Sequence, residues 1–167
     1  MPKRAQVQPK ESVKMTDMTE MEVSCALCGA KSKQLVLLSS SIFGHPDLDG
    51  RPGPTLGEVI PMLVQACPNC QYCAQDISAM KRMADGLRLI TKEKAYQEQF
   101  NNQDYPEKAD HNLCASIIQE KTNHDLEAAN TSLLAAWDCD DEEKPEAAIK
   151  CRERAIAFFR KLKNPHS

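Results

Sequence analysis

The chain has 167 residues, of which 41% are hydrophobic and 27% are charged, a composition typical of one soluble globular unit. Lysine and arginine total 21 and aspartate and glutamate total 24, so the net charge is −3. This mildly acidic balance argues against a general binder of nucleic acid or of an anionic membrane. The apolar runs are too short to span a bilayer, so we expect a cytoplasmic protein.

Glycine placement predicts how the chain is divided. Residues 1–22 are polar and carry four basic and four acidic groups, so we expect a disordered N-terminal tail. Five of the six glycines lie between Gly29 and Gly57, which favours irregular or β structure in residues 23–76. Residues 77–164 should be helical. The expected fold class is α+β, with a small β head followed by a helical C-terminal bundle.

In the head, two short apolar runs predict strands, Gln34 to Leu38 and Met62 to Ala66. Ser39 to Gly57, between them, is rich in serine, glycine and proline. We expect this loop to be ordered without regular structure, because Phe43, Leu48 and Leu56 give it enough apolar surface to pack on the head.

Helical periodicity predicts four helices in the rest of the chain. The first places Ile77, Met80, Ala84, Leu87, Thr91 and Ala95 on one face. The second begins near Pro106, and the third follows a possible capping box at Thr122 to Asp125. The fourth begins near Pro145 and ends at Asn164-Pro165. Because a short acidic turn, Asp138 to Glu143, joins the last two helices, we expect an antiparallel hairpin.

Each of these helices has an expected buried face. For the second it is Leu113, Cys114, Ile117 and Ile118; for the third, Leu126, Ala129, Leu133, Ala136 and Trp137; for the fourth, Ala148, Cys151, Ala155, Phe158, Phe159 and Leu162. His111 and His124 are expected at the surface.

The strongest chemical signal is a pair of C-x-x-C motifs, Cys25 to Cys28 and Cys67 to Cys70. Each motif places two thiolates on one tight turn, and zinc prefers four such ligands in a tetrahedron. Gly29 after the first motif permits the positive φ that closes the turn, whereas Gln71 occupies that place after the second. We therefore predict a Zn²⁺ site with Cys25, Cys28, Cys67 and Cys70 as ligands and no catalytic residues.

The remaining cysteines leave an alternative open. Cys73 extends the second motif to C-x-x-C-x-x-C, the beginning of a ferredoxin-type run, so an iron–sulfur or metal-dependent redox site using Cys73 is the competing hypothesis. A catalytic site would draw on His45 and Asp47 nearby. We favour a packing role for Cys73, Cys114 and Cys151, because cysteine is among the most buried residue types. Cys139 is expected to be half-exposed.

The two motifs, the long insertion between them, Tyr72 after the second motif and the helices that follow resemble the bacterial domain-of-unknown-function family 2225 over about residues 23 to 160. This resemblance implies a zinc ribbon-like head with metal ligation by Cys25, Cys28, Cys67 and Cys70. It also implies a tetratricopeptide-like helical tail and no established activity.

Residues 25–75 carry three basic and three acidic side chains, a balance that argues against a nucleic-acid-binding ribbon. We therefore expect a non-enzymatic zinc protein that acts as a protein-protein interaction module. Its partner should be a protein, not nucleic acid or a membrane.

Overall fold

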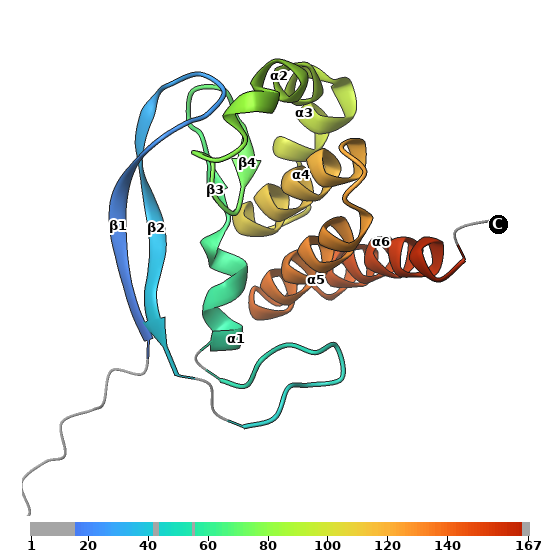
Figure 1. Ribbon diagram of the computed structural model, residues 1–167. Coiled ribbons are helices and arrows are strands. Elements are labelled where there is room, and N and C mark those ends of the chain that lie inside the picture. Colours follow the sequence, from blue (N-terminus) through green and yellow to red (C-terminus); the bar gives the residue numbers. More distant parts are fainter. Residues whose placement is uncertain (1–15, 42–43, 55, 165–167) are drawn as a thin grey trace, which may run out of the picture.

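The computed structural model describes residues 16–41, 44–54 and 56–164, and these form two small antiparallel sheets followed by a set of helices (Figure 1). The fold is therefore α+β with a helical C-terminal part, as the sequence predicts. The strands are β1 (Thr16–Ser24), β2 (Lys31–Ser40), β3 (Gln65–Ala66) and β4 (Cys73–Ala74). The helices are α1 (Leu56–Val59), α2 (Ala84–Lys92), α3 (Lys94–Phe100), α4 (Glu107–Lys121), α5 (Asp125–Asp141) and α6 (Pro145–Lys163), with 3₁₀ turns η1 (Ile60–Leu63) and η2 (Lys81–Met83). We call β1 to β4 with their turns the head, and α2 to α6 the helical part.

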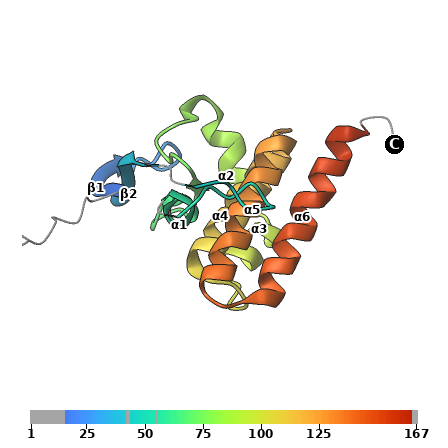
Figure 2. The ribbon, with the colours of Figure 1, turned by 90° about the horizontal axis from the view of Figure 1, so that it is seen from below.

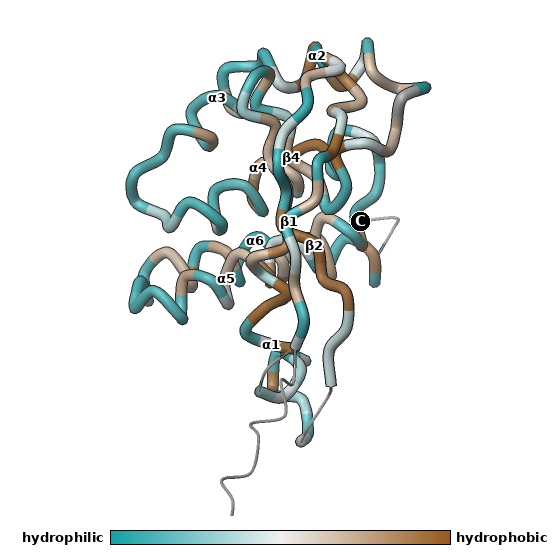
Figure 3. Tube along the Cα trace, turned by 90° about the vertical axis from the view of Figure 1, so that its left-hand side faces the viewer, coloured by the Kyte–Doolittle hydropathy of each residue, from teal (hydrophilic) through white to brown (hydrophobic). Residues whose placement is uncertain are grey.

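The first sheet is a long hairpin in which β1 pairs with β2 from Ser24↔Lys31 to Thr16↔Ser40. The strand expected at residues 34–38 is confirmed and is longer. The expected tail is wrong over residues 16–22, which belong to β1, while residues 1–15 lie outside the described residues. The acidic residues of this segment lie on an exposed strand. Glu22, for example, forms an ion pair at 2.9 Å with Lys31 of β2. In the tube coloured by hydropathy, β2 contains a hydrophobic stretch while β1 is mainly hydrophilic (Figure 3).

The second sheet is much smaller than expected. The predicted strand at residues 62–66 is wrong over its first half, because residues 60–63 form η1 and only Gln65–Ala66 pair with β4. Pro61 accounts for the difference: it cannot donate to a strand ladder, and its fixed φ suits the first turn of a helix.

The loop between β2 and α1 contacts the helical part. Its residues 44–54 contain no helix or strand. Arg51 donates two hydrogen bonds to Asp141 of α5, at 2.9 and 2.6 Å, and Asp49 pairs with Arg152 of α6. The expectation that Leu48 packs on the head is wrong, because it is fully exposed. Charge pairs on α5 and α6 hold the loop instead, and Phe43 lies outside the described residues.

The first predicted helix is divided. Ile77 and Met80 lie before the first helical turn, so their expected place in this helix is wrong. Helix α2 follows η2 and ends at Lys92, Glu93 has an extended backbone, and α3 begins at Lys94. No helix-breaking residue marks this point. The side chain of Gln97 donates to the carbonyl of Thr91 at 2.7 Å, so a residue of α3 satisfies a carbonyl that the break leaves free. The break turns α3 so that Tyr96 is fully buried.

Helices α4, α5 and α6 confirm the other three predictions, and consecutive helices pack together (Figures 1 and 2). Trp137, Ala136, Ala148, Cys151 and Ala155 are buried as expected. Three expected core residues are instead exposed, namely Leu126, Phe159 and Leu162. The expected half-exposure of Cys139 is also wrong, since it is fully buried because α5 continues through it.

The two turns between these helices have the same geometry. Asn123 and Glu143 both have positive φ, at 61° and 55°. The next N–H in each turn reaches back to a helical carbonyl, from His124 to Gln119 at 2.8 Å and from Lys144 to Cys139 at 2.7 Å. No capping box forms, because the Thr122 hydroxyl donates to the carbonyl of Ile118 at the end of α4.

Candidate metal centre

Each C-x-x-C motif forms the turn of one hairpin, and the two turns have equivalent hydrogen bonds. In the first, Gly29 N–H donates to the Cys25 carbonyl and Cys25 N–H to the Ala30 carbonyl, both at 2.9 Å. In the second, Gln71 N–H donates to the Cys67 carbonyl and Cys67 N–H to the Tyr72 carbonyl, also at 2.9 Å. The chain thus builds the same turn twice, once at the end of β1 and once at the end of β3.

The residue that closes each turn has a left-handed backbone, with φ 73° at Gly29 and 61° at Gln71. Glycine adopts this conformation without cost, whereas a residue with a Cβ loses roughly 1 kcal/mol. The second turn therefore forms in spite of its sequence, which indicates that its surroundings hold it in place.

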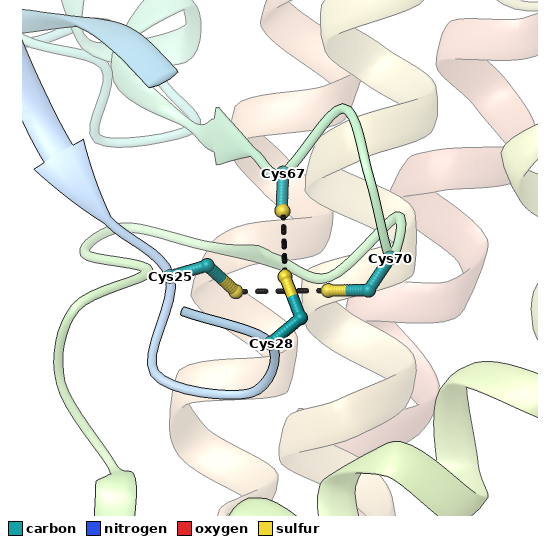
Figure 4. Close-up of side chains that lie close together, drawn as sticks. All are labelled: Cys25, Cys28, Cys67 and Cys70. Atoms are coloured by element: carbon teal, nitrogen blue, oxygen red, sulfur yellow. Dashed lines mark hydrogen bonds between the residues drawn. The ribbon is translucent and has the colours of Figure 1, made fainter. Parts of the chain in front are cut away.

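The four predicted cysteines come together between the two hairpins (Figure 4). Their sulfur atoms all lie within 4.8 Å of one another, with Cys25 to Cys70 at 3.6 Å and Cys28 to Cys67 at 3.5 Å. A tetrahedral ion with metal–sulfur bonds of about 2.3 Å requires sulfur–sulfur distances of about 3.8 Å. The four sulfurs fit this requirement, so the cluster can hold a metal ion.

Ionisation of the thiols differs across the cluster. Burial raises the pKa of Cys25 and Cys70. Burial also acts to raise the pKa of Cys28, but hydrogen bonds from the Asn69 side chain and the Ala30 backbone outweigh it and lower that pKa to about 6. Near neutral pH the cluster therefore includes one readily ionised thiol. Thiolate is the form that binds metal.

Two side chains of the helical part hold the turns in place. Tyr96 of α3 donates its hydroxyl hydrogen to the Gln71 carbonyl at 2.8 Å and accepts from Cys73 N–H at 3.1 Å. Arg88 of α2 donates from Nε to the Leu27 carbonyl at 2.8 Å. Sequence patterns missed both residues, because a helical tyrosine and arginine carry no motif that relates them to the cysteines.

The same region contains a shared hydrophobic core. Leu27, Tyr72, Ile77, Leu87 and Cys114 are all buried in one cluster. Leu27 and Tyr72 belong to the two cysteine turns, Leu87 to α2 and Cys114 to α4. The centre is therefore part of the junction between the head and the helical part.

Cys73 is fully buried and donates its thiol hydrogen to the Gln71 carbonyl at 3.5 Å. Within residues 16–41, 44–54 and 56–164, the group of close metal-ligating side chains contains the four motif cysteines alone. Cys73 is the first residue of β4 and thus has the packing role that we favour. Cys114 and Cys151 are buried on helical faces, as expected.

The residues considered for catalysis do not join the cluster. Asp47 accepts hydrogen bonds from the N–H groups of Asp49 and Arg51, both at 2.9 Å, and so shapes its own loop. His45 and His124 are exposed. The expectation of a surface position for His111 is wrong: it is buried and stacks on Phe100 at 5.3 Å, and burial lowers its pKa.

Comparison with known proteins gives no match to a protein family, to a curated protein or to a solved structure. Among the helices of the described residues, none combines the length and the apolar character needed to cross a membrane. The observed site is thus a four-cysteine cluster that can bind a metal ion, at the junction of an α+β fold.

Proposed function

We propose that Cys25, Cys28, Cys67 and Cys70 bind one Zn²⁺ and that the chain is a non-enzymatic, zinc-stabilised protein-interaction module. The observation that carries this proposal is the approach of four sulfurs from two equivalent turns to tetrahedral distances. An all-cysteine tetrahedral set favours zinc, and two C-x-x-C turns are the usual way in which a chain supplies it.

A structural role for the ion follows from its ligands. Four thiolates fill the tetrahedron, whereas a catalytic zinc keeps one position for water or substrate. The turns also pack their own side chains inward, because Leu27 and Tyr72 are almost fully buried. In this proposal the ion supplies a bond between the two hairpins, and the residues around it supply no reacting group.

The interaction role is supported by the helical part. Ile149 and Ile156 expose large apolar side chains on one face of α6, and isolated surface hydrophobics become informative where they share a face. The two equivalent turns that join α4, α5 and α6 are consistent with a repeated helical hairpin. The tetratricopeptide-like tail, the zinc ribbon-like head, the family resemblance and the cytoplasmic location stay predictions.

The metal assignment is tested by a matched pair of substitutions. Protein is purified anaerobically, and its zinc and iron contents are measured together with its absorption spectrum. The wild type should contain one zinc per chain and be colourless. Cys67→Ser should sharply lower the zinc content, whereas Cys73→Ser should leave it unchanged, since Cys73 lies outside the cluster.

Other outcomes of the same experiment would contradict the proposal. A full zinc complement in Cys67→Ser would remove that residue from the ligand set. Loss of metal in Cys73→Ser would show that Cys73 belongs to the ligand set. Brown protein that contains iron would favour the iron–sulfur alternative.

A further inference from the structure

Helix α6 lies at the edge of the helical part, on the side away from β1 and β2 (Figure 2). Its inner side buries Cys151, Ala155 and Phe158 against the rest of the bundle. Its outer side exposes Ile149 by 56% and Ile156 by 45%. These two isoleucines are seven positions apart, so they lie two helical turns apart on the same face.

The charged residues of α6 divide in the same way. Those nearer the bundle have partners: Arg152 pairs with Asp49 and Asp140, Arg154 with Glu120 and Lys161 with Asp125. Glu146, Glu153 and Arg160 recur every seven positions beside the isoleucines and form no ion pair with any described residue. The outer face therefore has unused charge of both signs around an apolar centre.

The order of these residues along α6 is complementary to its own reverse. An antiparallel pair of helices has a centre about which paired residues are symmetric. Ile149 and Ile156 are symmetric about a point between residues 152 and 153. Glu146 and Arg160 are symmetric about the same point within one residue. Glu153 falls near its own copy at this centre, and this single like-charge contact weakens the pairing. An antiparallel second α6 centred there has Ile149 opposite Ile156, and Glu146 beside Arg160 of the other copy at both ends of the contact. A parallel arrangement has like charges facing each other instead, which is unfavourable.

We propose that the outer face of α6 binds a second copy of the chain, antiparallel and in this register, to form a two-fold symmetric dimer. The proposal names one partner of the interaction module proposed above and rests on that part of it, while the zinc site is independent. An isologous contact is the commonest form of self-association, and it requires the self-complementarity that this face has. Because one helix contributes most of the contact, the dimer should be weak and reversible.

Sedimentation equilibrium of the full zinc-loaded chain, from micromolar to near-millimolar concentration, tests the proposal. The wild type should show a monomer–dimer equilibrium. Ile156→Glu should raise the dissociation constant by about tenfold or more, because it places a carboxylate against Ile149 of the other copy, twice in the contact. Leu126→Glu is the matched control: it changes an equally exposed apolar residue of α5, 51% exposed, and should leave the equilibrium unchanged.

A charge exchange tests the register. Glu146→Arg and Arg160→Glu should each weaken the dimer, and the double variant should restore it, because both pairs of opposite charge are rebuilt. A wild type that is monomeric throughout, or an Ile156→Glu variant that dimerises like wild type, overturns the proposal. A double variant weaker than both single variants overturns the register and with it the antiparallel contact.

Zinc measured on the same samples separates this proposal from the preceding one. A monomeric protein with one zinc per chain would contradict the dimer and leave the zinc site supported. A dimer that lacks zinc supports self-association and contradicts the zinc site.

Discussion

The head and the helical part satisfy the need for a core in different ways. In the head, β1 has no fully buried residue and β2 has one, Gln34. A two-stranded hairpin of this kind is marginally stable by itself. In the helical part, alanines and small residues of α4, α5 and α6 pack closely in a core of their own, with Ala109, Ala136 and Ala148 almost fully buried. The difference indicates that the head needs a cross-link and that the helices do not.

The junction between the two regions depends on the helical part as a scaffold. Tyr96 and Arg88 hold the two cysteine turns, and the loop at residues 44–54 is held on α5 and α6 by charge pairs. Substitutions in the helices should therefore affect both regions to different degrees, whereas substitutions in the turns should affect the head and the helices that share its core but not α5 and α6. The following predictions use this difference.

The largest effect is expected at Trp137, which is 6% exposed and lies below Arg51. Trp137→Ala should lower the free energy of unfolding of the helical part by about 3–5 kcal/mol, because it removes a large buried side chain and leaves a cavity. Chemical denaturation followed by circular dichroism measures this change. Leu126→Ala, at an exposed position of the same helix, should change it by less than about 0.5 kcal/mol. A near-neutral Trp137→Ala would contradict an independent helical core.

The next largest loss of stability is expected for Tyr96→Phe. The substitution keeps the ring but leaves Cys73 N–H and the Gln71 carbonyl without the hydroxyl, at a cost of about 2 kcal/mol. Because both groups belong to the second turn, zinc affinity measured by competition with a chelator should fall as well. Tyr105→Phe is the control, since no described residue hydrogen-bonds its hydroxyl; equal losses in the two variants would show that Tyr96 does not support the centre.

Gln71→Gly should have a smaller effect of the opposite sign. It relieves the left-handed strain at φ 61° and should stabilise the zinc-loaded protein by about 0.5–1 kcal/mol. Gly29→Ala at the equivalent place should destabilise it by about 1 kcal/mol. Thermal unfolding of the two variants measures both changes in stability. A loss of stability in Gln71→Gly would mean that the glutamine side chain contributes more than the strain costs.

The smallest effect concerns the loop that contacts the helices. The Leu48–Asp49 bond of this loop should be cut slowly at low salt by an endoproteinase that cleaves before aspartate, because Arg51 of the loop is held by Asp141. Asp141→Asn should accelerate cutting by about fivefold, which corresponds to an ion pair worth about 1 kcal/mol. High salt should accelerate wild-type cutting in the same direction. Glu143→Gln, in the neighbouring turn, should leave the rate unchanged, and rapid wild-type cutting at low salt would show that the loop is not held.

Sequence patterns predicted the parts of the molecule that depend on local chemistry. The spacing of Cys25, Cys28, Cys67 and Cys70 was sufficient to group them, and prolines at residues 106 and 145 located the beginnings of α4 and α6. Patterns failed where long-range contacts decide. The acids of β1 suggested a tail because its pairing with β2 is not visible in composition, and the break at Glu93 has no local signal.

Hydrogen exchange measured by mass spectrometry, with and without a zinc chelator, tests the central claim most directly. The account predicts that chelation removes amide protection from the two turns, residues 25–30 and 67–72, and from the strands beside them. It also predicts that peptides of α5 and α6 keep their protection, because their core does not include the cysteine cluster. Unchanged protection in the turns would contradict a metal-held head, and equal loss in α5 and α6 would contradict the independence of the helical part.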